Sequence, residues 1–154
     1  MAAAKQKYKQ TFQTMATNLK SFSDQVKQTE AEHVVASGNI YDATTYWEDI
    51  CKISQKLGFE ANKITIMWTN KPVPSPDDMV AVCSALELAC VSLLNVFYSF
   101  PVSEGQTVLR ILKSTVTDIL ESCVSFSTVL QSSVGVTYSE QHRHPLGNCY
   151  VKQN

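Results

Sequence analysis

Glycine and proline are scarce in this chain, with five residues of each among 154. Most of them lie between periodic segments, and this placement predicts long, uninterrupted elements. The glycines never cluster into a loop that could cradle a phosphate group. Hydrophobic residues make up 44% of the chain and charged residues 18%, which excludes a chain that is disordered throughout. A single domain of this length can bury a core without disulfides or metals.

The chain also lacks an excess of either charge. Thirteen Lys and Arg residues against fourteen Asp and Glu residues give a formal net charge of −1. General nucleic-acid binders usually carry a basic excess, so we expect no direct nucleic-acid binding. The N-terminus lacks the apolar core of a secretory signal. Residues 1–23 are amphipathic and contain lysine but no acid, so a mitochondrial transit peptide is the alternative; the absence of arginine there argues against it.

The five cysteines show no C-x-x-C spacing. Four of them, Cys51, Cys83, Cys90 and Cys123, fall inside helical patterns, and the fifth is Cys149. Free cysteine is among the most buried residue types. We therefore interpret the four as small core side chains in a reducing compartment.

Apolar residues recur at alternating spacings of four and three along four segments, which is typical of helices that pack at a shallow angle. The predicted helices cover about 5–36, 43–70, 76–100 and 104–131. Their seams are Tyr8, Phe12, Met15, Leu19, Phe22 and Val26; Tyr46, Ile50, Ile53, Leu57, Ala61, Ile64 and Trp68; Met79, Cys83, Leu86, Cys90, Leu93, Phe97 and Phe100; and Leu109, Leu112, Val116, Ile119, Cys123, Phe126 and Leu130. The second seam slips beside Gly58, which predicts a stutter that leaves Glu60 outside the core.

Residues with helix-capping preferences mark several helix ends. Asp42 and Ser75 are predicted N-caps, and Pro76 occupies the first helical position after Ser75. A capping box begins at Ser103, and Gly38 stands where a C-terminal glycine is expected.

The predicted fold class is all-α. Short connections make neighbouring helices antiparallel, so we expect residues 1–133 to form an up-down antiparallel four-helix bundle of long helices. Periodicity vanishes from about Ser132, and residues 134–154 are predicted to be a disordered C-terminal tail.

Potential catalytic and metal-binding residues are few. His142, His144 and Cys149 could grip a metal, but zinc sites need four ligands and no fourth is apparent, so a polar tail is the favoured interpretation. His33 could act as a buried base, but a histidine that complements a helix C-terminus is the favoured interpretation. We expect no catalytic residue, no metal and no cofactor, and hence no enzyme.

The segment 76–100 is unusually apolar, because Glu87 is its only charged residue between Asp78 and Glu104. A membrane span is one interpretation, but a charge at mid-segment costs several kcal/mol in lipid, and we expect no membrane association. The face away from the seam is also apolar, which suggests cover by a further helix from a partner, a second copy or a missing half of the protein; ordinary packing within the bundle is the alternative. This predicted protein-interaction face consists of Val80, Val91, Leu94 and Tyr98.

Several local motifs occur together in order along the chain. They are Pro74-Ser75-Pro76, Phe97-Tyr98-Ser99-Phe100-Pro101, Gly105-Gln106-Thr107-Val108-Leu109-Arg110 and Thr117-Asp118-Ile119-Leu120. With these motifs, the stretch from about Tyr46 to Leu130 resembles the N-terminal half of the cyclin-D-binding protein family, also called GCIP or Maid.

The resemblance implies an all-helical, non-enzymatic regulator of the cell cycle found in nucleus and cytoplasm. Members of that family bind D-type cyclins and dampen phosphorylation of the retinoblastoma protein and the transcription that it controls. They are also described as helix-loop-helix proteins without a basic region, which inhibit transcription factors of that class. The segment 72–76 fits this description because it contains no Lys/Arg run.

The resemblance implies a family that continues into an acidic linker and a second helical half. We interpret the residues after Ser133 of this chain as an unrelated tail instead, as expected of an alternative or truncated form. The leading hypothesis is a helical interaction module that binds D-type cyclins, helix-loop-helix factors or both. The alternative is a scaffold or adhesion bundle, similar to vinculin or talin modules, that binds cytoskeletal partners.

Overall fold

The computed structural model describes residues 2–29, 42–101 and 104–143, with side chains described up to residue 136. Almost all of these residues belong to four helices: α1 (Ala2–Gln28), α2 (Ala43–Thr69), α3 (Pro76–Tyr98) and α4 (Gln106–Arg143). No strand occurs in these ranges. The predicted all-α class is therefore confirmed.

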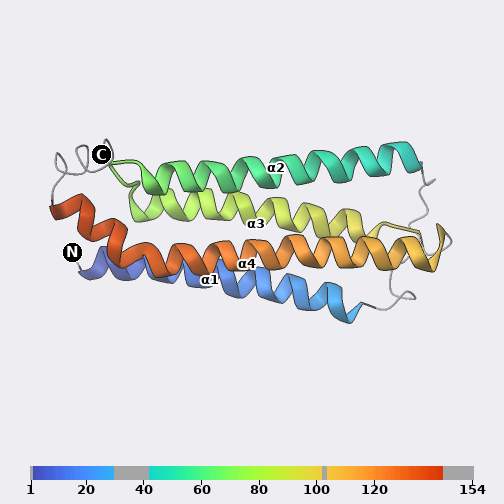
Figure 1. Cartoon of the computed structure of the whole chain (residues 1–154), viewed down its shortest axis with the longest axis horizontal. Coiled ribbons are helices and arrows are strands. Elements are labelled where there is room, and N and C mark those ends of the chain that lie inside the picture. The colour runs from blue at the N-terminus through green and yellow to red at the C-terminus, as the bar shows by residue number, and fades with distance from the viewer. Residues whose placement is uncertain (1, 30–41, 102–103, 144–154) are drawn as a thin grey trace, which may run out of the picture.

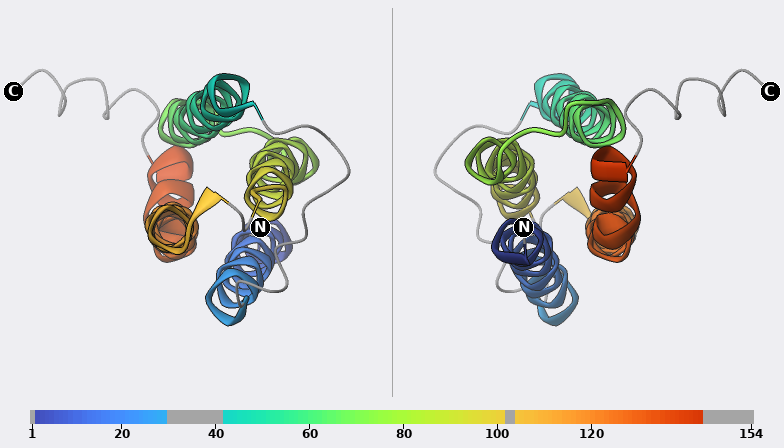
Figure 2. Two further views of the ribbon diagram at one scale, coloured as in Figure 1. Left: turned by 90° about the vertical axis from the view of Figure 1, so that its right-hand side faces the viewer. Right: turned by 90° about the vertical axis from the view of Figure 1, so that its left-hand side faces the viewer.

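The four helices lie side by side along the long axis of the molecule, and the chain reverses direction from each helix to the next (Figure 1). Seen end-on, they surround a common centre with α1 and α2 on opposite sides (Figure 2). α1 packs closely against α4 and α3, α2 packs closely against α3, and α3 approaches α4 across the centre. Along the described part of the chain, α2 and α4 pack less extensively than these pairs, so the bundle is loosest on that side.

The core is continuous and rich in aromatic side chains. Phe12, Trp68, Phe97 and Phe100 are almost completely buried. The Trp68 ring packs edge-on against Tyr8 and Phe12, with ring centroids 5.1 and 5.2 Å apart. Such aromatic pairs contribute about 0.5–1.5 kcal/mol beyond the apolar area that they bury. The aromatic residues therefore fasten α1 to the C-terminal end of α2.

Two of the predicted helix starts are confirmed. The Asp42 carboxylate accepts hydrogen bonds from the Thr44 amide at 3.1 Å and the Thr45 hydroxyl at 2.8 Å. The Ser75 hydroxyl accepts from the Asp78 amide at 3.2 Å. These bonds satisfy amide groups that have no partner within a helix. The fourth helix, predicted to begin at about residue 104, begins at Gln106 instead. The capping residue predicted for it, Ser103, falls outside the described residues.

The predicted end of the first helix is wrong. α1 ends at Gln28, and Thr29 is not helical. The Thr29 amide donates to the Val26 carbonyl at 3.2 Å, which tightens the last turn, and the Lys113 ammonium donates to the Thr29 carbonyl at 2.9 Å. The Thr29 amide and carbonyl thus have hydrogen-bond partners without a further helical turn, whereas apolar periodicity alone indicated that the helix continues. The predicted stretch 30–36 and Gly38 lie outside the described residues.

The predicted start of the disordered tail is also wrong. α4 continues to Arg143, so residues 134–143 are helical, and Val134 is completely buried. Val134 follows Leu130 by four positions and extends the apolar seam. The start of α1 lies beside this extension, because a Cβ placed on Gly135 would lie 3.8 Å from the Lys5 side chain. Residues 144–154 lie outside the described part of the chain.

The predicted slip in the seam of α2 is confirmed at its end and wrong at its start. Glu60 is buried and Ala61 is half-buried, so the seam does not slip beside Gly58. Trp68 is buried whereas Met67 is half-buried, so the extra residue of spacing follows Ile64 instead. The Glu60 carboxylate lies within this interface: one oxygen is buried without a hydrogen-bond partner, and the other lies 3.8 Å from the Lys56 ammonium.

Candidate functional site

The predicted interaction face of α3 lies largely against α1. Leu94 is buried, Val91 and Tyr98 are half-buried, and Val80 is exposed. The Tyr98 hydroxyl lies 3.2 Å from the Thr29 hydroxyl at the end of α1. Packing within the chain thus covers most of this face, and its role in partner binding stays a prediction.

A groove between α2 and α4 is the strongest candidate for a functional site. It has a volume of about 380 Å³, and its lining is mostly apolar. The lining residues, which define the α2–α4 groove, are Ser54, Leu57, Gly58, Ala61, Ile119, Ser122, Cys123 and Phe126. None of these side chains is charged. The groove lies where the bundle is loosest, because α2 and α4 do not pack closely.

The two walls of the groove differ in character. On α2, Ser54, Gly58 and Ala61 follow one another at spacings of four and three, so three small residues share one face. On α4, Ile119 and Phe126 lie two turns apart and contribute the bulk. A bulky wall opposite a small one leaves room for a further apolar side chain or helix.

The bulky wall continues along α4 as an apolar stripe beyond the groove. Val129 lies three positions after Phe126, and Ile111 lies eight positions before Ile119, so helical periodicity places both on the same face. Val129 is 65% exposed and Ile111 is 62% exposed. We define the α4 stripe as Val108, Ile111, Ile119, Phe126, Val129 and Val136.

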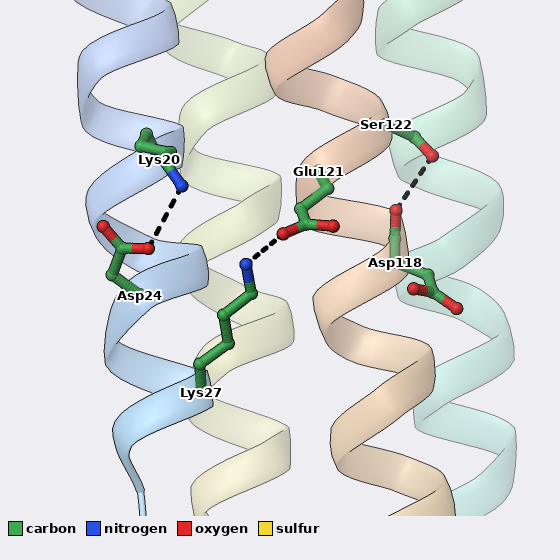
Figure 3. A network of polar contacts seen from close by, with 6 residues as sticks. All are labelled: Lys20, Asp24, Lys27, Asp118, Glu121 and Ser122. Atoms are coloured by element: carbon green, nitrogen blue, oxygen red, sulfur yellow. Dashed lines mark hydrogen bonds and ion pairs between the residues drawn. The ribbon is translucent and has the colours of Figure 1, made fainter.

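The opposite face of α4 is held by α1. The Lys27 ammonium of α1 forms a hydrogen-bonded ion pair with the Glu121 carboxylate of α4 (Figure 3). In the same view, the Ser122 hydroxyl donates to the backbone carbonyl of Asp118, 2.8 Å away. This bond satisfies Ser122 within its own helix, so its hydroxyl makes no demand on an apolar occupant of the groove.

Beyond one end of the groove, a hydrogen bond joins buried Trp68 of α2 to half-buried Ser133 of α4. The Trp68 indole nitrogen on α2 donates to the Ser133 hydroxyl on α4 at 2.8 Å. Ser133 in turn donates to the carbonyl of Leu130 at 2.7 Å. The groove is therefore bounded at this end by a specific contact between α2 and α4.

Four ionisable side chains near the centre of the bundle, Glu87, Cys83, Cys90 and Cys123, have shifted pKa values. Burial raises the pKa of the Glu87 carboxyl, and a hydrogen bond from the Asn18 amide opposes this shift. Burial raises the pKa of the Cys83 thiol to about 12. A hydrogen bond from Cys90 lowers the pKa of the groove-lining Cys123 thiol. The predicted core placement holds for Cys83 and Cys90 but is wrong for Cys51, which is exposed.

No group of three or more potential metal-ligating side chains occurs in the ranges that the structure describes. His33, His144 and Cys149 lie outside these ranges, and His142 lies in the part of α4 whose side chains are not described. The interpretations of these residues therefore stay predictions.

By length and composition alone, α3 and the Gln106–Val136 part of α4 could each cross a membrane. A core helix of a folded bundle meets the same criterion, and α3 contributes the most buried residues of the helices whose burial is described throughout. The expected absence of membrane association stays a prediction.

Comparison with known protein families identifies the family. A family model described as "Grap2 and cyclin-D-interacting, N-terminal" matches residues 49–150, which is more than half of the chain. The chain belongs to this family. The resemblance to cyclin-D-binding proteins that the sequence motifs indicated is thereby confirmed, and the matched region contains both walls of the α2–α4 groove. The interpretation of the residues after Ser133 as an unrelated tail is wrong, because the match extends to residue 150.

Several curated proteins of the cyclin-D-interacting family are similar to the chain. It is 23% identical over 134 residues to the zebrafish (Danio rerio) cyclin-D1-binding protein 1 homolog, covering 87% of the chain and 38% of that protein. It is 24% identical to the Xenopus laevis homolog, covering 77% of the chain and 35% of that protein. The human cyclin-D1-binding protein 1 is 23% identical, with coverage of 83% and 34%. The chain thus spans little more than a third of these relatives, and no solved structure matches it.

Sequence reasoning missed the groove for a physical reason. Five of its eight lining residues were assigned to helix seams, and the seam pattern does not show which pair of helices fails to close. One signal was available, since Ile111, Val129 and Val136 are apolar but lie off the predicted seam of α4. Together with the small residues of α2, this second stripe would have indicated an additional contact surface.

Proposed function

We propose that the chain is an up-down antiparallel four-helix bundle that acts as a non-enzymatic interaction module and binds a D-type cyclin through the α2–α4 groove. The observation that carries this proposal is its membership of the cyclin-D-interacting family, over a region that includes the groove. The relatives' names refer to binding of cyclin D1.

The chemistry of the groove favours an apolar helix face as its occupant. The lining has no charged side chain, and the α4 stripe adds exposed valine and isoleucine on the same side. Burying one such side chain contributes roughly 1.5–3 kcal/mol, so three or four of them can supply the affinity of a specific contact. Laying the apolar face of a helix into a groove is a common mode of recognition.

The proposal extends to regulation. Occupying a cyclin in this way would slow cell-cycle progression, and the same groove would accept a helix of a helix-loop-helix transcription factor. On this proposal the module works in cytoplasm and nucleus without contacting nucleic acid, and a second copy or a further helical half could occupy the groove instead.

The proposal also means that the cyclin and the helix-loop-helix factor compete for the groove. Coprecipitation of labelled factor at rising concentrations of cyclin tests this competition, and simultaneous binding of both partners would contradict a shared groove.

The groove is tested by paired aspartate substitutions. Ile111→Asp with Val129→Asp puts charge on the α4 stripe, whereas Phe59→Asp with Leu88→Asp puts equal charge on other surfaces; all four residues are 62–66% exposed. Binding of a purified D-type cyclin is measured by sedimentation velocity. We expect the first pair to weaken binding at least tenfold, because a charge would be buried at the contact, and the second pair to leave it unchanged.

If the two double variants lost cyclin binding equally, or if both kept full binding, the α4 stripe would not be the specific contact. Circular dichroism of each variant establishes that the helices are intact, since these exposed positions contribute little to folding.

A further inference from the structure

The outer face of α2 combines exposed apolar side chains with lysines. α2 packs extensively only against α3 in the described part of the chain, so much of its surface faces away from the bundle. Phe59 is 65% exposed and Ile66 is 54% exposed, and they lie two helical turns apart on one face. We define the α2 outer face as Glu48, Lys52, Lys56, Phe59, Lys63 and Ile66, all of which are exposed. Two large apolar side chains together on an exposed face mark a candidate contact surface.

The lysines give this face a positive charge that the bundle leaves largely uncompensated. Lys52 precedes Phe59 by two turns, and Lys56 and Lys63 lie one turn before and after it, so helical spacing places all three on the same face. The Lys56 ammonium lies 3.8 Å from the Glu60 carboxylate. Lys52 and Lys63 form no ion pair with any residue that the structure describes.

We propose that the α2 outer face binds an acidic amphipathic helix of a partner protein. Apolar residues of that helix cover Phe59 and Ile66, and its carboxylates pair with the three lysines. The charge of the face selects this occupant, because carboxylates complement the lysines whereas a basic helix is repelled by them. None of the six residues of the face lines the α2–α4 groove, so the proposal is independent of the one for cyclin binding.

The pattern of residues along α2 favours a protein helix over an anionic membrane as the occupant. Glu48 precedes Lys52 by one turn on the same face, and an anionic lipid surface repels a carboxylate there. A partner helix can match Glu48 with a basic residue of its own. Helices that lie in a membrane interface also bury a broad apolar face, whereas this one offers two apolar side chains.

The dimensions of the face suit a helix as well. From Glu48 to Ile66 it extends for about 27 Å at 1.5 Å per residue, so a partner helix of about 18 residues covers it. Apolar anchors at helical spacing, flanked by charges, are a common means by which one helix recognises another.

Synthetic helical peptides test the proposal on the whole chain. The acidic probe has about 18 residues, with leucines at alternating spacings of three and four and glutamates on both sides of the leucine stripe. The control probe has lysine in place of each glutamate, and binding is measured by fluorescence anisotropy of labelled peptide. We expect the acidic probe to bind at least about tenfold more tightly than the control probe. Raising the salt concentration from about 0.05 M to about 0.5 M should weaken its binding at least about fivefold.

Matched charge reversals locate the binding on the chain. Lys52→Glu with Lys63→Glu reverses two charges on the α2 outer face, whereas Lys7→Glu with Lys9→Glu makes the same change in net charge on α1; all four lysines are exposed. We expect the α2 variant to bind the acidic probe at least about tenfold more weakly than wild type, and the α1 variant to lose less than about threefold. Circular dichroism establishes that the helices are intact, since exposed positions contribute little to folding.

A further variant separates the apolar contacts from the charges. Phe59→Ser with Ile66→Ser keeps every charge, and we expect it to weaken binding of the acidic probe at least about tenfold, because its apolar anchors are lost. Cyclin binding should stay unchanged in this variant and in both charge reversals, because none of the substituted residues lines the α2–α4 groove. A failure of this proposal is therefore distinguishable from a failure of the cyclin proposal.

Several results would overturn the assignment of this face to an acidic helix. They are no binding of the acidic probe, equal losses in the two charge-reversal variants, and full binding in Phe59→Ser with Ile66→Ser. Capture of the chain by phosphatidylserine vesicles but not by the acidic probe would assign the face to a membrane instead. A wild-type dimer in sedimentation velocity that Lys52→Glu with Lys63→Glu abolishes would assign it to a second copy.

Discussion

Glu60 lies on the buried face of α2, with 6% of its surface exposed and one carboxylate oxygen without a hydrogen-bond partner. Its other oxygen is 3.8 Å from the ammonium of Lys56, a side chain that is itself largely exposed. A buried polar group without a partner costs roughly 1–3 kcal/mol. At the scale of single residues, this position is a weak point in an otherwise apolar interface.

Glu60→Met should stabilise the fold, because methionine fills a similar volume and needs no hydrogen-bond partner. We expect the free energy of unfolding to rise by about 1–2 kcal/mol, measured by urea denaturation. Glu48→Met, at an exposed position on the same helix, is the control and should change little. A loss of stability at Glu60→Met would mean that the ion pair with Lys56 outweighs the unpartnered oxygen.

Glu87 makes stability depend on pH. Its pKa in the folded chain is raised above the ordinary value of 4.5 because burial disfavours the carboxylate. At pH values between the ordinary pKa and the raised pKa of the folded chain, the folded chain binds more protons than the unfolded chain. The free energy of unfolding therefore falls as pH rises through this window. Glu87→Gln should flatten this fall in urea titrations between about pH 4 and pH 7. An unchanged slope in that variant, or an equal flattening in exposed Glu104→Gln, would contradict the assignment.

At the scale of helices, the sequence predicted correctly those helix starts that depend only on neighbouring residues. Asp42 and Ser75 cap their helices because a side-chain oxygen needs only an amide two or three positions away. The ends of α1 and α4 were missed because distant contacts decide them. Thr29 is held by Lys113, and Gly135 lies against Lys5 at the other end of the sequence.

The extension of α4 makes a direct prediction. Val134 is completely buried, whereas Val136 is 61% exposed on the same helix. Val134→Asp should lower the free energy of unfolding by about 3 kcal/mol or more, because an unpaired charge would be buried. Val136→Asp should lower it by less than about 0.5 kcal/mol. Thermal unfolding followed by circular dichroism compares the two, and equal effects would argue that this stretch does not pack on the bundle.

At the scale of the whole molecule, the bundle is closed on three sides and loose on the fourth. α1 packs extensively against two helices, whereas α2 packs extensively only against α3 in the described part of the chain. The groove follows from this asymmetry, which no single seam encodes: Leu57 and Cys123 both belong to regular seams and still line a groove together. Sequence periodicity therefore predicted the helices well and their arrangement incompletely.

The same asymmetry predicts that α2 opens before the rest of the bundle. Elements with few close neighbours have the lowest free energies of local opening. Native-state hydrogen exchange should therefore show amides in the middle of α2 exchanging at least about tenfold faster than amides in the middle of α4. Equal protection in both helices would show that the bundle opens only as a unit.

Gly58 gives the open side of the bundle a further meaning for protein engineering. A Cβ at this position would meet no atom within 4 Å, so Gly58→Ala fits without strain. Alanine is favoured over glycine in a helix interior by roughly 0.5–1 kcal/mol, and the variant should show this gain in thermal unfolding. The added methyl group would also begin to fill the groove through which we propose that a partner binds. On that proposal, Gly58→Ala would raise thermostability at the expense of binding, so selection for heat resistance alone would erode recognition.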